Sequence, residues 1–140
     1  MKMVLNRVDG DYGMEVFSES GQCVSFDAAE KIGGKDFGIR PMEGVLSSLA
    51  ACSSIDVLLI LKKQKLEPIT YSVEINAERV DAVPSIFKKI HLTFNLKGKL
   101  PKEKVQRAVE LSMTKYCSVV KILETTCQIS YSITLETNNK

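Results

Sequence analysis

Two cysteines in unlike surroundings are the residues of this sequence best suited to chemistry. Cys52 lies in a long apolar segment, residues 44–56, and Cys117 lies in the short motif Lys115-Tyr116-Cys117-Ser118-Val119. A thiolate attacks peroxides and disulfides, and a second thiol nearby resolves the oxidised product as a disulfide. If the fold brings Cys52 and Cys117 together, the protein has the minimum equipment for thiol redox chemistry.

The two cysteines differ in what could activate them. Cys52 is about ten residues, or roughly 15 Å, from the predicted start of its helix. The helix dipole acts mainly in the first turn, and apolar surroundings disfavour a thiolate. Cys52 is therefore either an inert core residue or a nucleophile that a cation from elsewhere stabilises. Cys117 lies beside the predicted start of a helix at residue 118, which favours a thiolate.

The other reactive side chains have structural interpretations. Cys127 lies on the apolar face of a predicted strand and Cys23 lies beside a hairpin turn, so both are expected to be structural. Asp56 follows Cys52 by four residues on the same helix face, where we expect it to bond to a nearby backbone or side-chain group. His91, the only histidine, is expected to be solvated. Without CxxC spacing or a second histidine, the sequence predicts no metal site.

Composition bounds the class of protein. The 140 residues suit a single domain, residues 1–140, and 44% of them are hydrophobic, enough for a core. The net charge of +2 and the absence of a long basic run predict no nucleic-acid partner. The N-terminus is polar too early for a secretory signal, so a cytoplasmic protein is expected. Residues 45–61 include Asp56 and fall short of the roughly 20 apolar residues of a membrane span, which predicts a core helix and no membrane.

The pattern of the first half predicts a β meander followed by a long helix. Strands are expected at residues 3–8, 14–18 and 22–27 within a meander over residues 1–39, with a flexible loop at residues 31–38. Pro41 opens a helix that runs to residue 65. Because this helix is apolar almost all round, it needs burial on every side. A chain this small hardly covers it alone, so we infer a dimer whose subunits share this core.

The second half alternates strictly in its strands. Residues 69–78 and 90–97 each have one polar face, which indicates an antiparallel sheet packed on one side. Helices are expected from Pro101 and over residues 118–125, and a last strand over residues 127–136. The order is βββ-α-ββ-α-α-β, and residues 40–140 form a helix and sheet core. The predicted fold class is α+β.

With these motifs the chain resembles the OsmC/Ohr family, the osmotically induced and organic-hydroperoxide-resistance proteins. Pro41-Met42-Glu43-Gly44-Val45-Leu46 followed by Leu49-Ala50-Ala51-Cys52 is similar to the first cysteine helix of that family. Lys115-Tyr116-Cys117-Ser118-Val119 is similar to its second cysteine motif. The Pro-Met-Glu, Cys-Ser-x-Ile-Asp and Lys-Tyr-Cys-Ser-Val variants most resemble the YhfA-like branch.

The resemblance implies an OsmC-like intertwined homodimer with a long buried central helix and with sites at the subunit interface. It also implies a cysteine-based hydroperoxide reductase, protective in oxidative stress, that needs no metal and no bound cofactor. The Cys52 thiolate attacks a small organic hydroperoxide and becomes a sulfenic acid. Cys117 condenses with it to a disulfide, which an external dithiol reduces.

In such enzymes an arginine stabilises the thiolate and a glutamate orients the arginine. The best-studied members place that glutamate ten residues before the first cysteine, where this chain has Met42. Glu43 lies nine residues before Cys52, about two and a half turns, so it points away from Cys52 along a straight helix. Glu43 either serves the partner subunit's site or complements the helix dipole. Arg40, in the loop that supplies the arginine in OsmC-type members, is the candidate cation or a solvated loop residue.

Arg79 and Arg107 are weaker candidates for the cation and are expected to make surface ion pairs. Two other functions stay open beside the peroxidase. One is a non-catalytic module that binds a small hydrophobic molecule with both thiols inert. The other is a thiol-disulfide redox sensor or repair protein that uses the same cysteines on a disulfide substrate.

Overall fold

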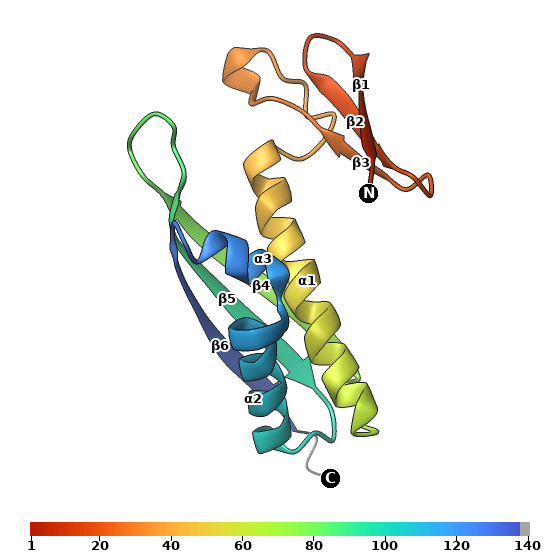
Figure 1. Ribbon diagram of the computed structural model, residues 1–140, viewed down its shortest axis with the longest axis vertical. Coiled ribbons are helices and arrows are strands. Elements are labelled where there is room, and N and C mark those ends of the chain that lie inside the picture. Colours follow the sequence, from red (N-terminus) through yellow and green to blue (C-terminus); the bar gives the residue numbers. More distant parts are fainter. Residues whose placement is uncertain (138–140) are drawn as a thin grey trace. The chain divides into compact units, whose positions relative to one another are not determined.

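Three short strands joined by glycine-containing turns open the chain. In the computed structural model, which describes residues 1–137, they form an antiparallel sheet in the order β1-β2-β3 (Figure 1). β1 spans Met3–Asp9, β2 Gly13–Ser18 and β3 Cys23–Phe26, and a 3-10 turn, η1, covers Glu30–Ile32. The predicted meander is therefore confirmed. It belongs to a first compact unit that ends at Ser47, and the second unit begins at Ser48. A single domain over residues 1–140 stays a prediction.

Helix α1 spans Pro41–Lys63 and begins where the sequence predicted. The Glu43 carboxylate, in the first turn, accepts a hydrogen bond from the backbone N–H of Arg40 at 2.8 Å. This bond caps the start of the helix, because it satisfies the N–H group of the residue that precedes the helix. The helix ends two residues earlier than predicted. Lys65 has a positive φ of 61°, and the backbone N–H of Leu66 closes the end on the carbonyl of Leu61 at 3.0 Å.

The second sheet has the order β4-β5-β6, with β4 over Thr70–Arg79, β5 over Phe87–Lys97 and β6 over Gln128–Glu136. β4 and β5 are antiparallel, as their alternation predicted. β6 runs parallel to β5, a direction that the alternation of the strands did not predict. A parallel neighbour requires a long crossover connection, and here the crossover carries the remaining helices.

Those helices and the second half of α1 lie on one face of the sheet (Figure 1). α2 spans Lys102–Leu111, a π-helical turn, η2, spans Ser112–Tyr116, and α3 spans Ser118–Leu123. The core between them and the sheet is fully buried and apolar; it comprises Leu49, Val57 and Leu61 of α1, Ile90, Leu92 and Phe94 of β5, and Val105, Ala108 and Val109 of α2. The observed order confirms the predicted α+β class.

Within one chain, α1 is buried along a single stripe. Only Leu49, Ser53, Val57 and Leu61 are buried, whereas Ile55 is 66% exposed and Leu59 47% exposed. The sequence predicted that α1 is buried on every side, but the described residues of one chain do not cover it in this way. By length and hydropathy alone α1 would also suffice to cross a membrane, a test that core helices of soluble proteins pass equally.

A candidate site of two thiols and a carboxylate

Three side chains from two distant parts of the second unit converge on one point. The sulfur atoms of Cys52 and Cys117 and a carboxylate oxygen of Asp56 all lie within 4.8 Å of one another. Cys117 is buried, whereas Cys52 and Asp56 are partly exposed. The structure therefore brings together the two cysteines that the sequence selected, and it adds a carboxylate beside them.

Local structure explains this convergence. Cys52 and Asp56 are four residues apart on α1, so their side chains share one helix face. Cys117 comes directly after the π-helical turn, where its backbone N–H bonds to the carbonyl of Ser112 at 2.9 Å. This wider turn ends the helix, and Cys117 takes an extended conformation with φ −69° and ψ 108°. π-Turns recur at functional sites because they redirect a side chain that an α-helix would place elsewhere.

Ser112 connects the π-helical turn to helix α1. Its buried hydroxyl lies 3.0 Å from the backbone carbonyl oxygen of Ser53 and 3.4 Å from Oδ2 of Asp56. A hydroxyl has one proton, so it donates to one of these oxygens at a time. Asp56 thus bonds to a nearby side chain, as the sequence predicted. Nothing in the sequence pattern indicated Ser112 or the proximity of Asp56 to Cys117.

The buried thiol is difficult to ionise. Burial raises the pKa of Cys117 to about 11, and the neighbouring Cys52 thiol raises it further. Hydrogen bonds from the backbone N–H groups of Val120 and Val119 lower this pKa, but by less than burial raises it. The sequence analysis expected the helix start to favour a thiolate here. That expectation is wrong, because desolvation outweighs the few N–H groups at the start of the six-residue α3.

We expect Cys117 to react slowly with alkylating agents and to gain reactivity steadily with pH. With a pKa of about 11, about one Cys117 in 10⁴ is a thiolate at pH 7, and the fraction rises about tenfold per pH unit up to pH 10. The check is iodoacetamide labelling of the reduced protein, read by peptide mass spectrometry, with circular dichroism confirming the fold at each pH. A labelling rate that levels off by pH 9 would contradict the raised pKa.

The Asp56 carboxylate has no salt-bridge partner among residues 1–137. The weaker cation candidates are engaged elsewhere. Arg107 pairs with Glu110 at 2.8 Å on the surface, as predicted, but Arg79 makes no ion pair there and donates from Nε to the carbonyl of Ser85 at 2.7 Å.

A cavity of about 350 Å³ adjoins the site. Asp56 and Tyr116, the neighbour of Cys117, line this cavity. The other lining residues are the apolar Leu59, Ile60 and Leu111 and the polar Lys63 and Gln64. Its volume is in the range of pockets that bind small organic molecules. The cavity gives a ligand access to the Asp56 side of the site.

The predicted activating residues lie in the first unit and have partners there. The Arg40 guanidinium pairs with Asp36 and donates to the carbonyl of Gly38 at 3.0 Å. Glu43 caps α1, which agrees with its interpretation as a helix-start residue. The roles of Arg40 and Glu43 toward the thiols stay predictions.

Asp27 organises the loop that carries Arg40, a role the sequence did not indicate. It is buried and accepts hydrogen bonds from the backbone N–H groups of Lys35 and Ala28 at 2.7 Å and of Phe37 at 3.1 Å. The bond from Lys35 contributes most to lowering the pKa of Asp27, against the effect of burial. The loop predicted to be flexible is therefore tied to one central carboxylate.

The remaining cysteines divide into one core and one surface residue. Cys127 is buried, which confirms its predicted packing role. Its thiol donates to the Leu123 carbonyl at 3.2 Å. Cys23 is exposed at the start of β3, so the expectation of a structural cysteine is wrong for the described chain.

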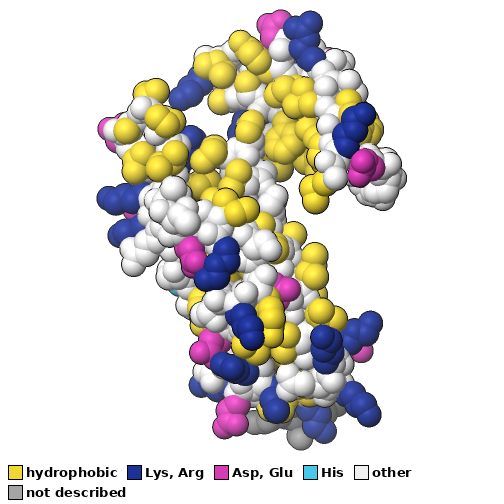
Figure 2. All heavy atoms as spheres, viewed as in Figure 1, with side chains coloured by type: hydrophobic (Ala, Val, Ile, Leu, Met, Phe, Trp, Pro, Cys, Tyr) yellow, Lys and Arg dark blue, Asp and Glu magenta, His cyan; other side chains and the backbone are white. Residues whose placement is uncertain are grey.

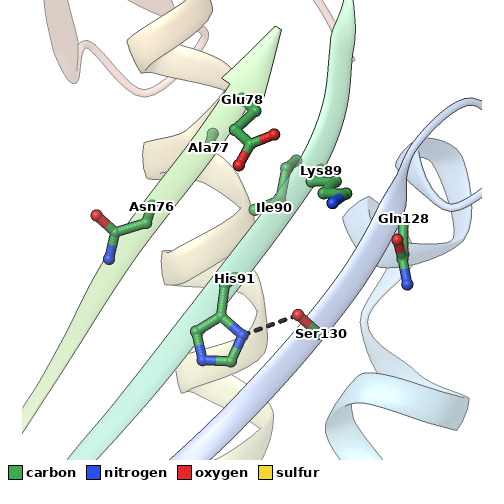
Figure 3. Close-up of a pocket in the computed structure, with 8 residues that line it drawn as sticks. All are labelled: Asn76, Ala77, Glu78, Lys89, Ile90, His91, Gln128 and Ser130. Atoms are coloured by element: carbon green, nitrogen blue, oxygen red, sulfur yellow. Dashed lines mark hydrogen bonds between the residues drawn. The ribbon is translucent and has the colours of Figure 1, made fainter.

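A second hollow, of about 520 Å³, lies on the polar face of the second sheet and contains neither thiol (Figure 3). His91 points toward Ser130 there, with Nδ1 at 2.8 Å from its hydroxyl and Nε2 at 3.0 Å from that of Ser132. The histidine is thus half-buried between two serines rather than freely solvated. With both ring nitrogens occupied, it offers no free base to the thiol site.

Comparison with known proteins places this chain in a family. Residues 33–132 match the family of OsmC-like proteins. Protein YhfA of Escherichia coli K12 is 41% identical over 93 residues, which cover 66% of this chain and 69% of YhfA. A hypothetical protein from Aquifex aeolicus VF5 has a TM-score of 0.78 at 26% identity, over 96% of each chain. The organic hydroperoxide resistance protein OhrB of Bacillus subtilis shares the fold at 18% identity, with a TM-score of 0.68 over 96% of this chain and 98% of OhrB.

Proposed function

This chain belongs to the OsmC-like protein family, in its YhfA-like branch, and on that premise we propose that it is a thiol-dependent peroxidase for small organic hydroperoxides. The observation that carries the proposal is the approach of the Cys52 and Cys117 sulfur atoms to within 4.8 Å. The organic hydroperoxide resistance proteins that share the fold support the choice of substrate class. We place the reaction in the cytoplasm, where external dithiols are available.

The difference in burial between the two thiols supports a proposed order of reaction. Cys52 is the more accessible, so its thiolate attacks the peroxide oxygen, the O–O bond breaks, and the alkoxide takes a proton and leaves as an alcohol. Cys52 is then a sulfenic acid. The Cys117 thiol attacks that sulfur, a disulfide forms and water leaves. An external dithiol reduces the disulfide and restores both thiols.

The proposed cation that favours the Cys52 thiolate is Arg40, with Glu43 as its orienting residue. Both lie at the start of α1, the helix that carries Cys52. The acidic neighbour of the two thiols is Asp56, so a positive group is needed to favour the Cys52 thiolate. Arginine fits this role because it stays charged at all relevant pH values.

We propose a homodimer on the evidence of exposed apolar surface. Ile55 and Leu59 expose an apolar face of α1, and in Figure 2 hydrophobic side chains gather on the visible face of the first unit. Exposed apolar patches of this kind typically mark association surfaces. We expect a mass of two chains in sedimentation equilibrium, and Ile55→Glu should shift it toward one chain. A wild-type monomer at micromolar concentration would contradict the dimer.

The proposed function is tested with reduced, chelator-treated protein, tert-butyl hydroperoxide and dithiothreitol. We expect many peroxide molecules to be consumed per chain, at a rate that exceeds the reduction of a small disulfide substrate. Faster disulfide exchange would favour the redox sensor. Absence of both activities would favour the binding module.

A further inference from the structure

The three side chains at the thiol site form a ligand set for a thiophilic metal ion. Cys52, Asp56 and Cys117 supply two sulfur atoms and one carboxylate oxygen, all within 4.8 Å of one another. Zinc sites use these atoms, with Zn–S near 2.3 Å and Zn–O near 2.0–2.2 Å. Tetrahedral geometry then places two sulfur ligands about 3.8 Å apart. Side-chain adjustments of about 1 Å are therefore enough to close a site around one ion.

The charges at the site also favour a dication. With a metal bound, two thiolates and the Asp56 carboxylate carry three negative charges, and no ion pair among residues 1–137 neutralises Asp56. Zn²⁺ binds cysteine and aspartate in their deprotonated forms, so a dication matches the charge of this ligand set. Two thiols and a carboxylate at this spacing are thus well suited to a zinc ion.

We propose that the reduced protein binds one Zn²⁺ per chain through Cys52, Asp56 and Cys117. Both sulfur atoms bind as thiolates, the proton of Cys117 is released, and the occupied site carries one net negative charge. The proposal does not depend on peroxidase activity. It adds a means of regulating the site, since sulfur atoms that hold a zinc ion cannot form the Cys52–Cys117 disulfide.

The surroundings meet the other requirements of a metal site. The Ser112 hydroxyl, 3.4 Å from Oδ2 of Asp56, is an outer-shell donor that orients the carboxylate. Three protein ligands leave a fourth position of the tetrahedron for water. The cavity of about 350 Å³ that Asp56 and Tyr116 line provides the path by which the ion and that water enter.

The test is a titration of reduced, metal-free full-length protein with Zn²⁺ in competition with a chromophoric chelator, repeated with Co²⁺. We expect one Zn²⁺ per chain with Kd below about 1 µM, release of protons on binding, and thiolate-to-cobalt charge-transfer absorption with Co²⁺. Cys52→Ser and Cys117→Ser should each weaken binding by at least about a hundredfold, and Asp56→Asn by at least about tenfold. The oxidised Cys52–Cys117 disulfide form should not bind.

Matched controls separate this site from adventitious binding. Cys23→Ser removes an exposed thiol and Asp81→Asn removes an exposed loop carboxylate, and both should bind Zn²⁺ as the wild type does. A Kd above about 1 µM, or an affinity unchanged by Cys52→Ser and by Asp56→Asn, would overturn the proposal. Binding without peroxide turnover would refute only the proposed function, and turnover without binding would refute only the zinc site.

Discussion

Replacing Cys52 by serine should abolish peroxide consumption. We expect the rate with tert-butyl hydroperoxide and a dithiol to fall by at least about a thousandfold, because a serine hydroxyl is not an activated nucleophile at neutral pH. The side chain changes by one atom and is only partly buried, so the fold should persist. The measurement is peroxide consumption under steady-state conditions, with thermal unfolding recorded for both proteins.

Cys23→Ser is the matched control for this result. It makes the same chemical change at an exposed cysteine outside the site, and it should leave the rate unchanged. Full activity in Cys52→Ser protein would refute the proposed mechanism. An equal loss in both variants would show that the activity belongs to accessible thiols in general.

Replacing Cys117 by serine should stop turnover through the disulfide while leaving a single oxidation event. Cys52 would still reduce about one equivalent of peroxide per chain, and its sulfenic acid would accumulate for lack of a resolving thiol. The measurement combines a stopped peroxide assay with trapping of Cys52 by dimedone and mass spectrometry. The wild type should give little trapped product, because Cys117 captures the sulfenic acid first.

Because Cys117 is buried, a serine at this position can also destabilise the fold, so a second variant is needed. A serine hydroxyl in this buried position costs about 1–3 kcal/mol if it finds no hydrogen-bond partner. Cys117→Ala avoids the buried hydroxyl and should give the same kinetic result. Wild-type turnover in either folded variant would contradict the role of Cys117 as the resolving thiol.

Local patterns were sufficient to predict most elements of the fold. Strict alternation marks β4 to β6, and Pro41 and Pro101 stand at the starts of α1 and α2, as the preference of proline for helix starts requires. The parallel pairing of β6 with β5 was missed because alternation reports which face is buried and not the direction of the neighbouring strand.

The thiol site was only partly visible in the sequence. The spacing of Cys52 and Asp56 on one helix face follows from helical periodicity. The position of Cys117 depends on the π-helical turn at Ser112–Tyr116 and on the Ser112 bond to α1, which are tertiary features without a local signal. The ionisation of Cys117 was misjudged for a similar reason, since burial depends on packing that the sequence does not specify.

The central claim is that Cys52 and Cys117 form one redox-active pair, and free-thiol counting tests it most directly. Reduced, metal-free protein is treated with one equivalent of tert-butyl hydroperoxide per chain, and its thiols are counted and mapped by mass spectrometry before and after. We expect the loss of two of the four thiols as a Cys52–Cys117 disulfide, with Cys23 and Cys127 unchanged. Four unreacted thiols at millimolar peroxide would contradict it.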